Sequence, residues 1–141
     1  LNPDKQSIMG HSMGGLGALN IAFRNPEIYK TVSAFAPIAN PTNGVWGQKQ
    51  FEAYLGKEKE NWKKYDPSIL LSEQGYKGKI LIDQGTKDDF LKNLMPEVLE
   101  KIFNLRNNGD QLRYQKDYDH SYFFVSSFLR DHVLWHKEKV K

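Results

Sequence analysis

Cysteine is absent from the 141 residues of this chain. Its absence excludes disulfide bonds, a cysteine nucleophile and any metal site built on thiolates. No apolar run approaches the roughly 18 residues of a membrane-spanning helix, so we expect no membrane span. Long runs of like charge are also scarce, because the 20 basic residues are largely interleaved with the 17 acidic ones. That pattern is typical of a solvated surface, and we expect no nucleic-acid partner.

What the chain does contain is typical of a folded domain: 39% of its residues are hydrophobic and 13% are aromatic. This length and composition predict one domain over residues 1–141. A secretory signal is not evident, which favours a cytoplasmic protein. The sequence begins at Leu1, six residues before a strand that should be central in its sheet. We therefore expect the domain to be partial, with its N-terminal strands outside this chain.

The most informative motif is G-x-S-x-G, present as Gly10-His11-Ser12-Met13-Gly14. A short extended run precedes it and a helix-like stretch follows it. A sharp strand-to-helix turn of this kind lifts the serine hydroxyl above the sheet, where it can attack a carbonyl. We attribute the glycines to a lack of room for Cβ atoms in the turn and to close helix packing. A glycine-rich turn that only packs a helix is the alternative.

Strands and helices are predicted to alternate along most of the chain. This order predicts an α/β fold with a mostly parallel sheet covered by helices on both faces. Gly109 is the expected C-terminal cap of the helix before it, and Asp66 could cap the helix that begins at Pro67. The expected strands are residues 7–9, 31–35, 79–83 and 111–116, and the expected helices are residues 13–23, 48–55, 60–65, 67–72, 96–108 and 121–136.

A serine nucleophile needs a base and an orienting carboxylate, in the chain order serine, acid, histidine. Asp88 and Asp89 follow one expected strand, and His120 follows another. All these candidates fall at the carboxyl ends of strands, where open parallel sheets place their sites. The aspartates could instead face solvent or cap a helix, and His120 could cap the last helix.

Two further histidines, His132 and His136, are spaced four residues apart on the last expected helix. That spacing could hold a metal ion, but no third ligand accompanies it, so we expect a solvated helix face and no metal. His11 flanks the serine, and we expect it to pack beside the cleft or to line it.

These residues resemble the S-formylglutathione hydrolase (esterase D) family of the α/β-hydrolase superfamily. G-x-S-x-G alone would indicate only the superfamily, whereas the D-Q-G and Y-D-H-S-Y blocks make the resemblance specific. The similar blocks lie in the family's order over nearly the whole chain: residues 7–19, 32–41, 46–47, 54–56, 62–66, 82–85 and 118–122.

The resemblance implies a role for each of these residues. Ser12 would be the nucleophile, His120 the base, and the backbone N–H of Met13 one donor to the oxyanion. The family's acid lies three residues after the glycine of D-Q-G, which gives Asp88, with Asp89 as the fallback. A second oxyanion donor would come from a loop after an earlier strand, which is absent here.

The implied substrate is the thioester S-formylglutathione, cleaved to glutathione and formate without a metal or cofactor. Trp46 could narrow the acyl pocket, or it could simply pack the irregular segment around it against the body. Oligomeric state stays open, a homodimer included. With one oxyanion donor missing, we expect the 141 residues alone to be nearly inactive.

Three other readings stay open. The chain could belong to another esterase or an acyltransferase on the same scaffold. It could be a non-catalytic remnant, or an α/β ligand-binding module, which would not need serine, aspartate and histidine in this order.

Overall fold

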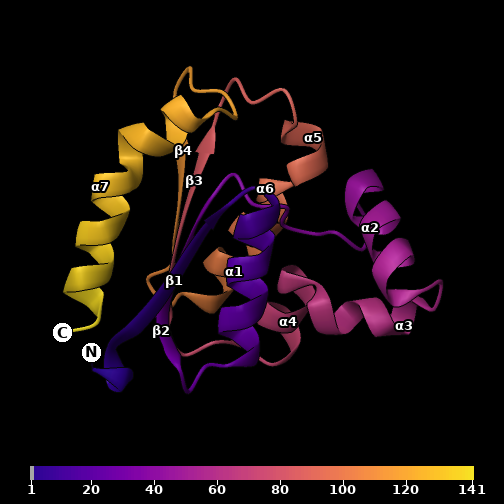
Figure 1. Cartoon of the computed structure of the whole chain (residues 1–141), viewed down its shortest axis with the longest axis horizontal. Coiled ribbons are helices and arrows are strands. Elements are labelled where there is room, and N and C mark those ends of the chain that lie inside the picture. The colour runs from indigo at the N-terminus through magenta and orange to yellow at the C-terminus, as the bar shows by residue number, and fades with distance from the viewer. Residues whose placement is uncertain (1) are drawn as a thin grey trace.

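The core of the fold is one sheet of four parallel strands, which the computed structural model describes together with the rest of residues 2–141 (Figure 1). The strands lie in the order β1 (Gln6–His11), β2 (Tyr29–Phe35), β3 (Lys79–Gly85) and β4 (Gln111–Gln115). Each neighbouring pair is parallel, as the alternation of strands and helices predicted. All four carboxyl ends therefore meet at one edge of the sheet.

Seven helices connect and cover the strands in the described part of the chain. They are α1 (Met13–Arg24), α2 (Val45–Leu55), α3 (Lys59–Trp62), α4 (Pro67–Glu73), α5 (Leu91–Leu94), α6 (Pro96–Arg106) and α7 (Tyr122–Lys139), with 3-10 turns at Pro3–Lys5 and Lys63–Tyr65.

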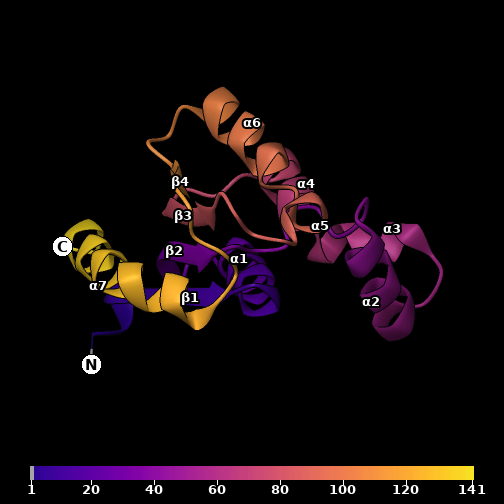
Figure 2. The same ribbon diagram turned by 90° about the horizontal axis from the view of Figure 1, so that it is seen from above.

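Helices cover both faces of the sheet, as predicted, and Figure 2 shows the two sides. On one side, α1, α4 and α6 enclose a hydrophobic core with β2 and β3. Alternate strand residues point into this core, among them Val32, Ala34, Ile80 and Ile82, all fully buried. On the other side, α7 lies across β2 and β3.

Several helix boundaries differ from the predicted ones. α2 begins at Val45, so Trp46 lies in a regular helix and not in an irregular segment. The prediction that Gly109 caps α6 is wrong, because the helix ends at Arg106 and Asn107 adopts the left-handed backbone (φ 49°) that closes it. The short helix α5 was not predicted. Asp66 does cap α4, because its carboxylate accepts hydrogen bonds from the N–H groups of Ser68 and Ile69.

The prediction of a solvated face for His132 and His136 is also wrong. Their spacing places both on one face of α7, and that face packs on the sheet, leaving His132 0% and His136 6% exposed. His132 binds Ser33 and Asp83, and His136 binds Ser33 and Thr31. At these two positions the underside of α7 is polar, matching the hydroxyls and the carboxylate that β2 and β3 present there.

Candidate active site

The G-x-S-x-G turn is a strained junction between β1 and α1. Ser12 has φ 57° and ψ −116°, a backbone conformation that residues with a side chain seldom adopt. Its N–H donates to the Phe35 carbonyl at 2.9 Å, which ties the turn to the end of β2. The serine side chain therefore stands at the carboxyl edge of the sheet.

Two glycines around this turn have no room for a side chain. A Cβ on Gly10 would lie 2.0 Å from the Gly14 carbonyl oxygen, and one on Gly15 would lie 2.9 Å from the Pro37 Cβ. Gly14 itself has open space, so the steric reason offered for the motif's glycines is wrong at that position. Glycine is required where the turn closes on itself and where α1 approaches the segment after β2.

Ser12, His120 and Asp88 form a hydrogen-bonded row across three loops at the carboxyl edge of the sheet. Ser12 Oγ lies 2.8 Å from His120 Nε2, and His120 Nδ1 lies 2.6 Å from Asp88 Oδ2. A carboxylate can only accept, so Nδ1 carries the proton, and Nε2 of the neutral ring accepts the Ser12 hydroxyl proton. The row can therefore pass a proton from the serine to the imidazole.

Asp88 is held as a carboxylate by its surroundings. Burial raises its pKa, but hydrogen bonds from His120, from the Phe90 N–H (2.8 Å) and from Gln84 Nε2 (3.0 Å) outweigh burial, and the pKa lies below its ordinary value. Asp89 is exposed. Of the two aspartates left open by the sequence, it is Asp88 that faces the histidine.

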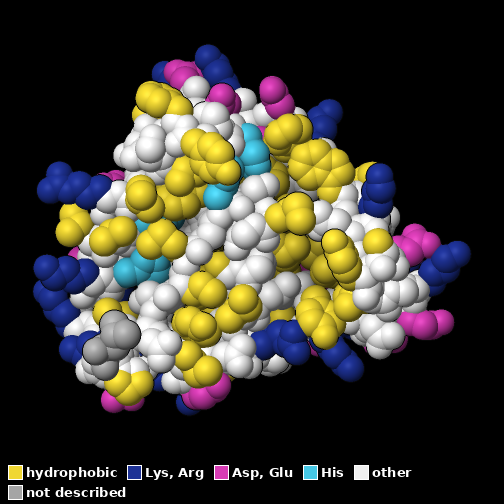
Figure 3. All heavy atoms as spheres, viewed as in Figure 1, with side chains coloured by type: hydrophobic (Ala, Val, Ile, Leu, Met, Phe, Trp, Pro, Cys, Tyr) yellow, Lys and Arg dark blue, Asp and Glu magenta, His cyan; other side chains and the backbone are white. Residues whose placement is uncertain are grey.

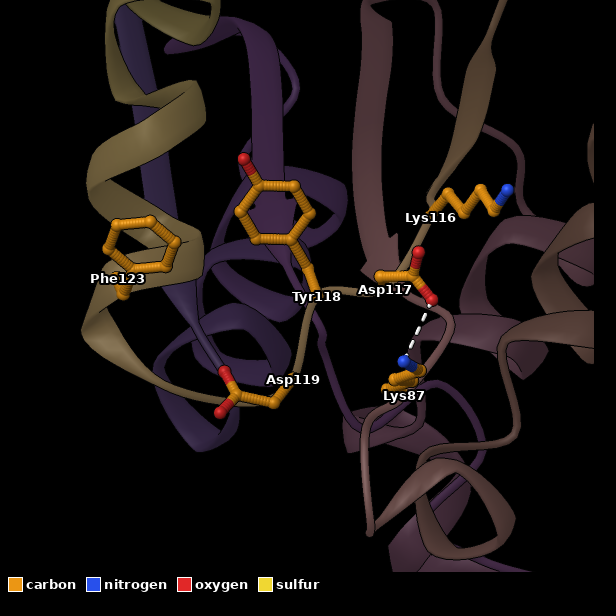
Figure 4. A pocket seen from close by; sticks show the side chains of 6 residues that line it. All are labelled: Lys87, Lys116, Asp117, Tyr118, Asp119 and Phe123. Atoms are coloured by element: carbon orange, nitrogen blue, oxygen red, sulfur yellow. Dashed lines mark ion pairs between the residues drawn. The ribbon is translucent and has the colours of Figure 1, made fainter.

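The loop that carries Asp88 and the loop that carries His120 are bonded to each other. Thr86 N–H donates to Gln115 O (3.0 Å), and Lys87 N–H donates to Tyr118 O (2.9 Å). Figure 4 shows the outer side of this junction, a hollow of about 510 Å³ across which Lys87 Nζ pairs with Asp117 Oδ1 at 3.0 Å. These bonds fix the position of the Asp88 carboxylate relative to the His120 imidazole.

His11 lies beside the histidine of the row. The ring centroids of His11 and His120 are 4.8 Å apart, and the His11 Nε2 atom is buried without a hydrogen-bond partner. Burial, and then the like charge of His120, lower the pKa of His11. The neutral ring of His11 therefore packs against the imidazole that would accept the serine proton.

A hollow of about 480 Å³ opens next to Ser12. Its wall is largely apolar, with one cation, Lys49, and its lining residues are Ser12, Met13, Ile38, Trp46, Lys49, Gln50, Ala53 and Tyr54. Of the two residues proposed for a substrate pocket, Trp46 lines this hollow and His11 does not. Figure 3 shows histidine side chains at the surface of one face of the molecule, with hydrophobic side chains around them.

Met13 is the first residue of α1, directly after Ser12. Its N–H is one of the four at a helix N-terminus that have no partner within the helix. A helix N-terminus also carries partial positive charge, which favours an anion beside Ser12.

Comparison with known proteins identifies the family of this chain. The family model described as "Putative esterase" matches residues 1–135. The chain belongs to this esterase family. A curated relative, the S-formylglutathione hydrolase of Paracoccus denitrificans (strain Pd 1222), is 54% identical over 140 residues, which are 99% of this chain and 50% of the relative. The esterase chain thus spans about half the length of that relative.

Solved structures show the same fold. An S-formylglutathione hydrolase from Agrobacterium tumefaciens superposes with a TM-score of 0.93 at 42% identity, over 99% of this esterase chain and 51% of the other. FphF, a fluorophosphonate-binding serine hydrolase of Staphylococcus aureus, superposes with a TM-score of 0.77 at 20% identity, over 100% and 57% of the two chains. At that identity the second likeness concerns the fold alone.

Two residues of the candidate site were missed from the sequence: Gln84, whose side chain bonds Asp88, and Phe90, whose backbone N–H bonds Asp88 and whose ring contacts His120. Gln84 follows the buried aliphatic run of β3, and Phe90 follows the two candidate aspartates. The D-Q-G block named Gln84 only as part of a resemblance, and a phenylalanine after two aspartates reads as an ordinary core residue. Their contacts to Asp88 depend on how the loop after β3 folds back.

The esterase chain holds a second serine–histidine–aspartate arrangement beneath α7. His132 lies 2.8 Å from Ser33 Oγ through Nδ1 and 3.1 Å from Asp83 Oδ2 through Nε2. Burial raises the pKa of Asp83, but bonds from His132 and Arg113 outweigh it, and the pKa lies below the ordinary value. All three residues are 0% exposed, so no substrate reaches them. The row at Ser12 and this buried arrangement share their hydrogen-bonding pattern, and they differ in whether a substrate can reach the serine.

Neither a metal centre nor a membrane helix is found in the part of the esterase chain that the structure describes. Among residues 2–141, no three histidine, aspartate or glutamate side chains cluster as a metal site would require. Within the same residues, each helix is too short or too polar to cross a bilayer.

Proposed function

We propose that the natural protein carrying this chain is a serine hydrolase that cleaves the thioester S-formylglutathione. The observation that carries the proposal is the accessible row from Ser12 through His120 to Asp88, with separations of 2.8 and 2.6 Å. The 54% identity to a curated S-formylglutathione hydrolase supports the substrate class. With this activity, the protein would act in formaldehyde detoxification, by releasing the formyl group of the thioester as formate and freeing glutathione.

The first half-reaction forms a formyl ester on Ser12. The Ser12 oxygen attacks the formyl carbon while its proton passes to His120 Nε2. Asp88, hydrogen-bonded to Nδ1, stabilises the imidazolium that forms. The backbone N–H of Met13 donates to the oxyanion, in the field of the α1 N-terminus. The carbon–sulfur bond then breaks, and His120 returns the proton to the sulfur, so that glutathione leaves as a thiol.

The second half-reaction releases formate. A water molecule attacks the formyl carbon, His120 accepts a proton from it, and the bond to Ser12 Oγ breaks as that oxygen regains the proton. Each step uses only side chains, backbone N–H groups and water, and the proposal includes no cofactor.

The hollow beside Ser12 is the proposed substrate pocket. Ile38, Trp46 and Ala53 give it an apolar wall that suits an acyl group, and Lys49 gives it a positive charge that suits an anionic leaving group such as glutathione. His11 lies behind His120 and would act on the base more than on the substrate.

The proposal extends to the domain that contains this chain, and to the location and partners of the protein. Residues 1–141 would be the second half of one α/β-hydrolase domain, since the chain spans 50% of its curated relative. A second oxyanion donor would come from the remaining half. Loss of one such donor costs about 10²–10³-fold, so residues 1–141 by themselves should be nearly inactive. We place the protein in the cytoplasm, without a nucleic-acid or membrane partner.

A substrate panel tests this function on the natural protein at its full length. It compares S-formylglutathione with S-acetylglutathione, nitrophenyl acetate and nitrophenyl butyrate. We expect the formyl thioester to have the highest kcat/KM, by at least about tenfold, because one added methyl group in a fitted pocket costs roughly 1–3 kcal/mol. Preference for the butyrate would indicate a general carboxylesterase or acyltransferase instead. No turnover, together with no reaction of Ser12 with a fluorophosphonate, would indicate a non-catalytic protein.

A further inference from the structure

His120 stands within a row of five rings. Trp46 lies 4.8 Å from Phe90, Phe90 lies 5.1 Å from His120, His120 lies 4.8 Å from His11, and His11 lies 5.8 Å from Tyr122, all between ring centroids. These separations are within the range of favourable aromatic pairs. The rings come from α2, the loop after β3, the loop after β4, the end of β1 and the start of α7, so the row joins segments distant in the sequence.

The two hydrogen bonds of His120 leave one rotation of its ring only weakly restrained. Contacts at Nδ1 and Nε2 fix a line through the ring, to Asp88 and Ser12. They resist tilting about that line only weakly, because a hydrogen bond tolerates tens of degrees of misalignment. Phe90 meets the His120 ring at 90° and His11 meets it at 39°, and both oppose that tilt.

Phe90 has a second connection to the same row. Its backbone N–H donates to Asp88 Oδ1 at 2.8 Å, while its ring touches His120. A single residue therefore holds the carboxylate with its backbone and the imidazole with its side chain. Replacing the ring removes only the second contact, which makes the two separable by mutation.

We propose that Phe90 and His11 are positioning residues that hold the His120 ring in the plane in which it can accept the Ser12 proton. This inference rests on the proposed function. The hydrogen-bond partner of the Ser12 hydroxyl is His120, so both residues act through the imidazole.

The test compares ring removal with ring retention in the natural protein at full length. Phe90→Leu and His11→Ala remove a ring, whereas Phe90→Tyr and His11→Phe keep one. We expect kcat for the formyl thioester to fall about threefold to tenfold in the first pair, with KM within about twofold, and to stay near the original value in the second pair. Phe123→Leu, which removes an exposed ring from α7 outside the row, is the matched control.

A spectroscopic readout separates positioning from general stability. The proton between His120 Nδ1 and Asp88 gives an NMR resonance far downfield of ordinary amide protons. We expect this resonance to shift or broaden in Phe90→Leu and His11→Ala, and to be unchanged in the ring-retaining variants and in Phe123→Leu. An unchanged resonance together with unchanged kcat in both ring-removing variants would overturn the inference. If the unsubstituted protein does not cleave the thioester, the proposed function fails, and the resonance alone decides the role of the two rings.

Discussion

The carboxylate of Asp88 lies 2.6 Å from Nδ1 of His120, while the next residue, Asp89, faces solvent. The two aspartates are neighbours of identical chemistry, so they form a natural matched pair. Asp88→Asn keeps the shape of the side chain but can donate to Nδ1, which would favour the wrong tautomer of His120. We expect kcat to fall by on the order of 10⁴-fold in Asp88→Asn, by analogy with the same change in other serine hydrolases.

Asp89→Asn is the control for that experiment. It should leave kcat within about twofold of the original value, because an exposed carboxylate outside the row contributes little. Steady-state kinetics on the full-length protein check both variants. A large loss in Asp89→Asn with little loss in Asp88→Asn would reassign the acid.

Glycine substitutions test the geometry of the strained turn. Gly10→Ala places a Cβ 2.0 Å from the Gly14 carbonyl oxygen, whereas a Cβ on Gly17 meets nothing within 4 Å. We expect Gly10→Ala to lower the free energy of unfolding by about 3 kcal/mol or more. Gly17→Ala, within α1, should instead raise it by about 0.5–1 kcal/mol. Urea unfolding measures both, and equal effects would show that the turn is not as tight as the structure has it.

Acid should destabilise the protein partly through His136. Burial, and then the charge of His132, lower the pKa of His136 to about 4 from its ordinary 6.5. The unfolded chain therefore binds a proton at pH values where the folded chain does not. Stability from this source is complete above about pH 6.5 and falls as the pH drops toward 4, by about 3 kcal/mol in total.

The variant His136→Gln isolates that contribution. It lacks the titrating ring, so its free energy of unfolding should change less between pH 6.5 and 4 than that of the original protein, although it is less stable at pH 7. Urea unfolding across this range gives both slopes. Parallel slopes would show that His136 titrates normally in the folded state.

Charge at the mouth of the pocket should affect KM for an anionic substrate and leave KM for a neutral one unchanged. Lys49 lines the hollow beside Ser12, and it lies on α2. We expect Lys49→Glu to raise KM for S-formylglutathione about threefold to tenfold, the usual scale of an exposed charge interaction reversed in sign. KM for nitrophenyl acetate should not change.

Lys137→Glu makes the same change of net charge elsewhere. Lys137 is exposed near the C-terminal end of α7. In both ribbon views α7 lies across the molecule from α2 (Figures 1 and 2). It should leave both KM values unchanged. An equal rise of KM in the two variants would assign the effect to net charge and not to the pocket.

Much of the architecture was predictable because local signals agreed with the global pattern. Residues 6–24 read as strand, turn and helix, and parallel strands bring their carboxyl ends to one edge whatever their sequence separation. That rule alone predicted that Ser12, His120 and an aspartate after β3 would converge. The residues alone left Asp88 and Asp89 open, because a shift of one residue in a loop changes neither composition nor pattern, and only the family resemblance favoured Asp88.

The histidines of α7 show what a sequence cannot specify. A spacing of four residues predicts that His132 and His136 share a helix face, but not whether that face meets water or a sheet. In the structure that face meets the sheet, where the hydroxyls of Thr31 and Ser33 on β2 bind α7. The ring contacts of Phe90 were hidden for the same reason, since they join segments that no local pattern connects.

The most direct measurement compares Ser12→Ala with Ser33→Ala in the full-length protein. Both serines bind a histidine that binds an aspartate, but only Ser12 is accessible. We predict that Ser12→Ala lowers kcat/KM for S-formylglutathione by at least about 10³-fold without unfolding the protein, and that Ser33→Ala keeps activity within about threefold. Turnover by Ser12→Ala within tenfold of the original protein would contradict the account.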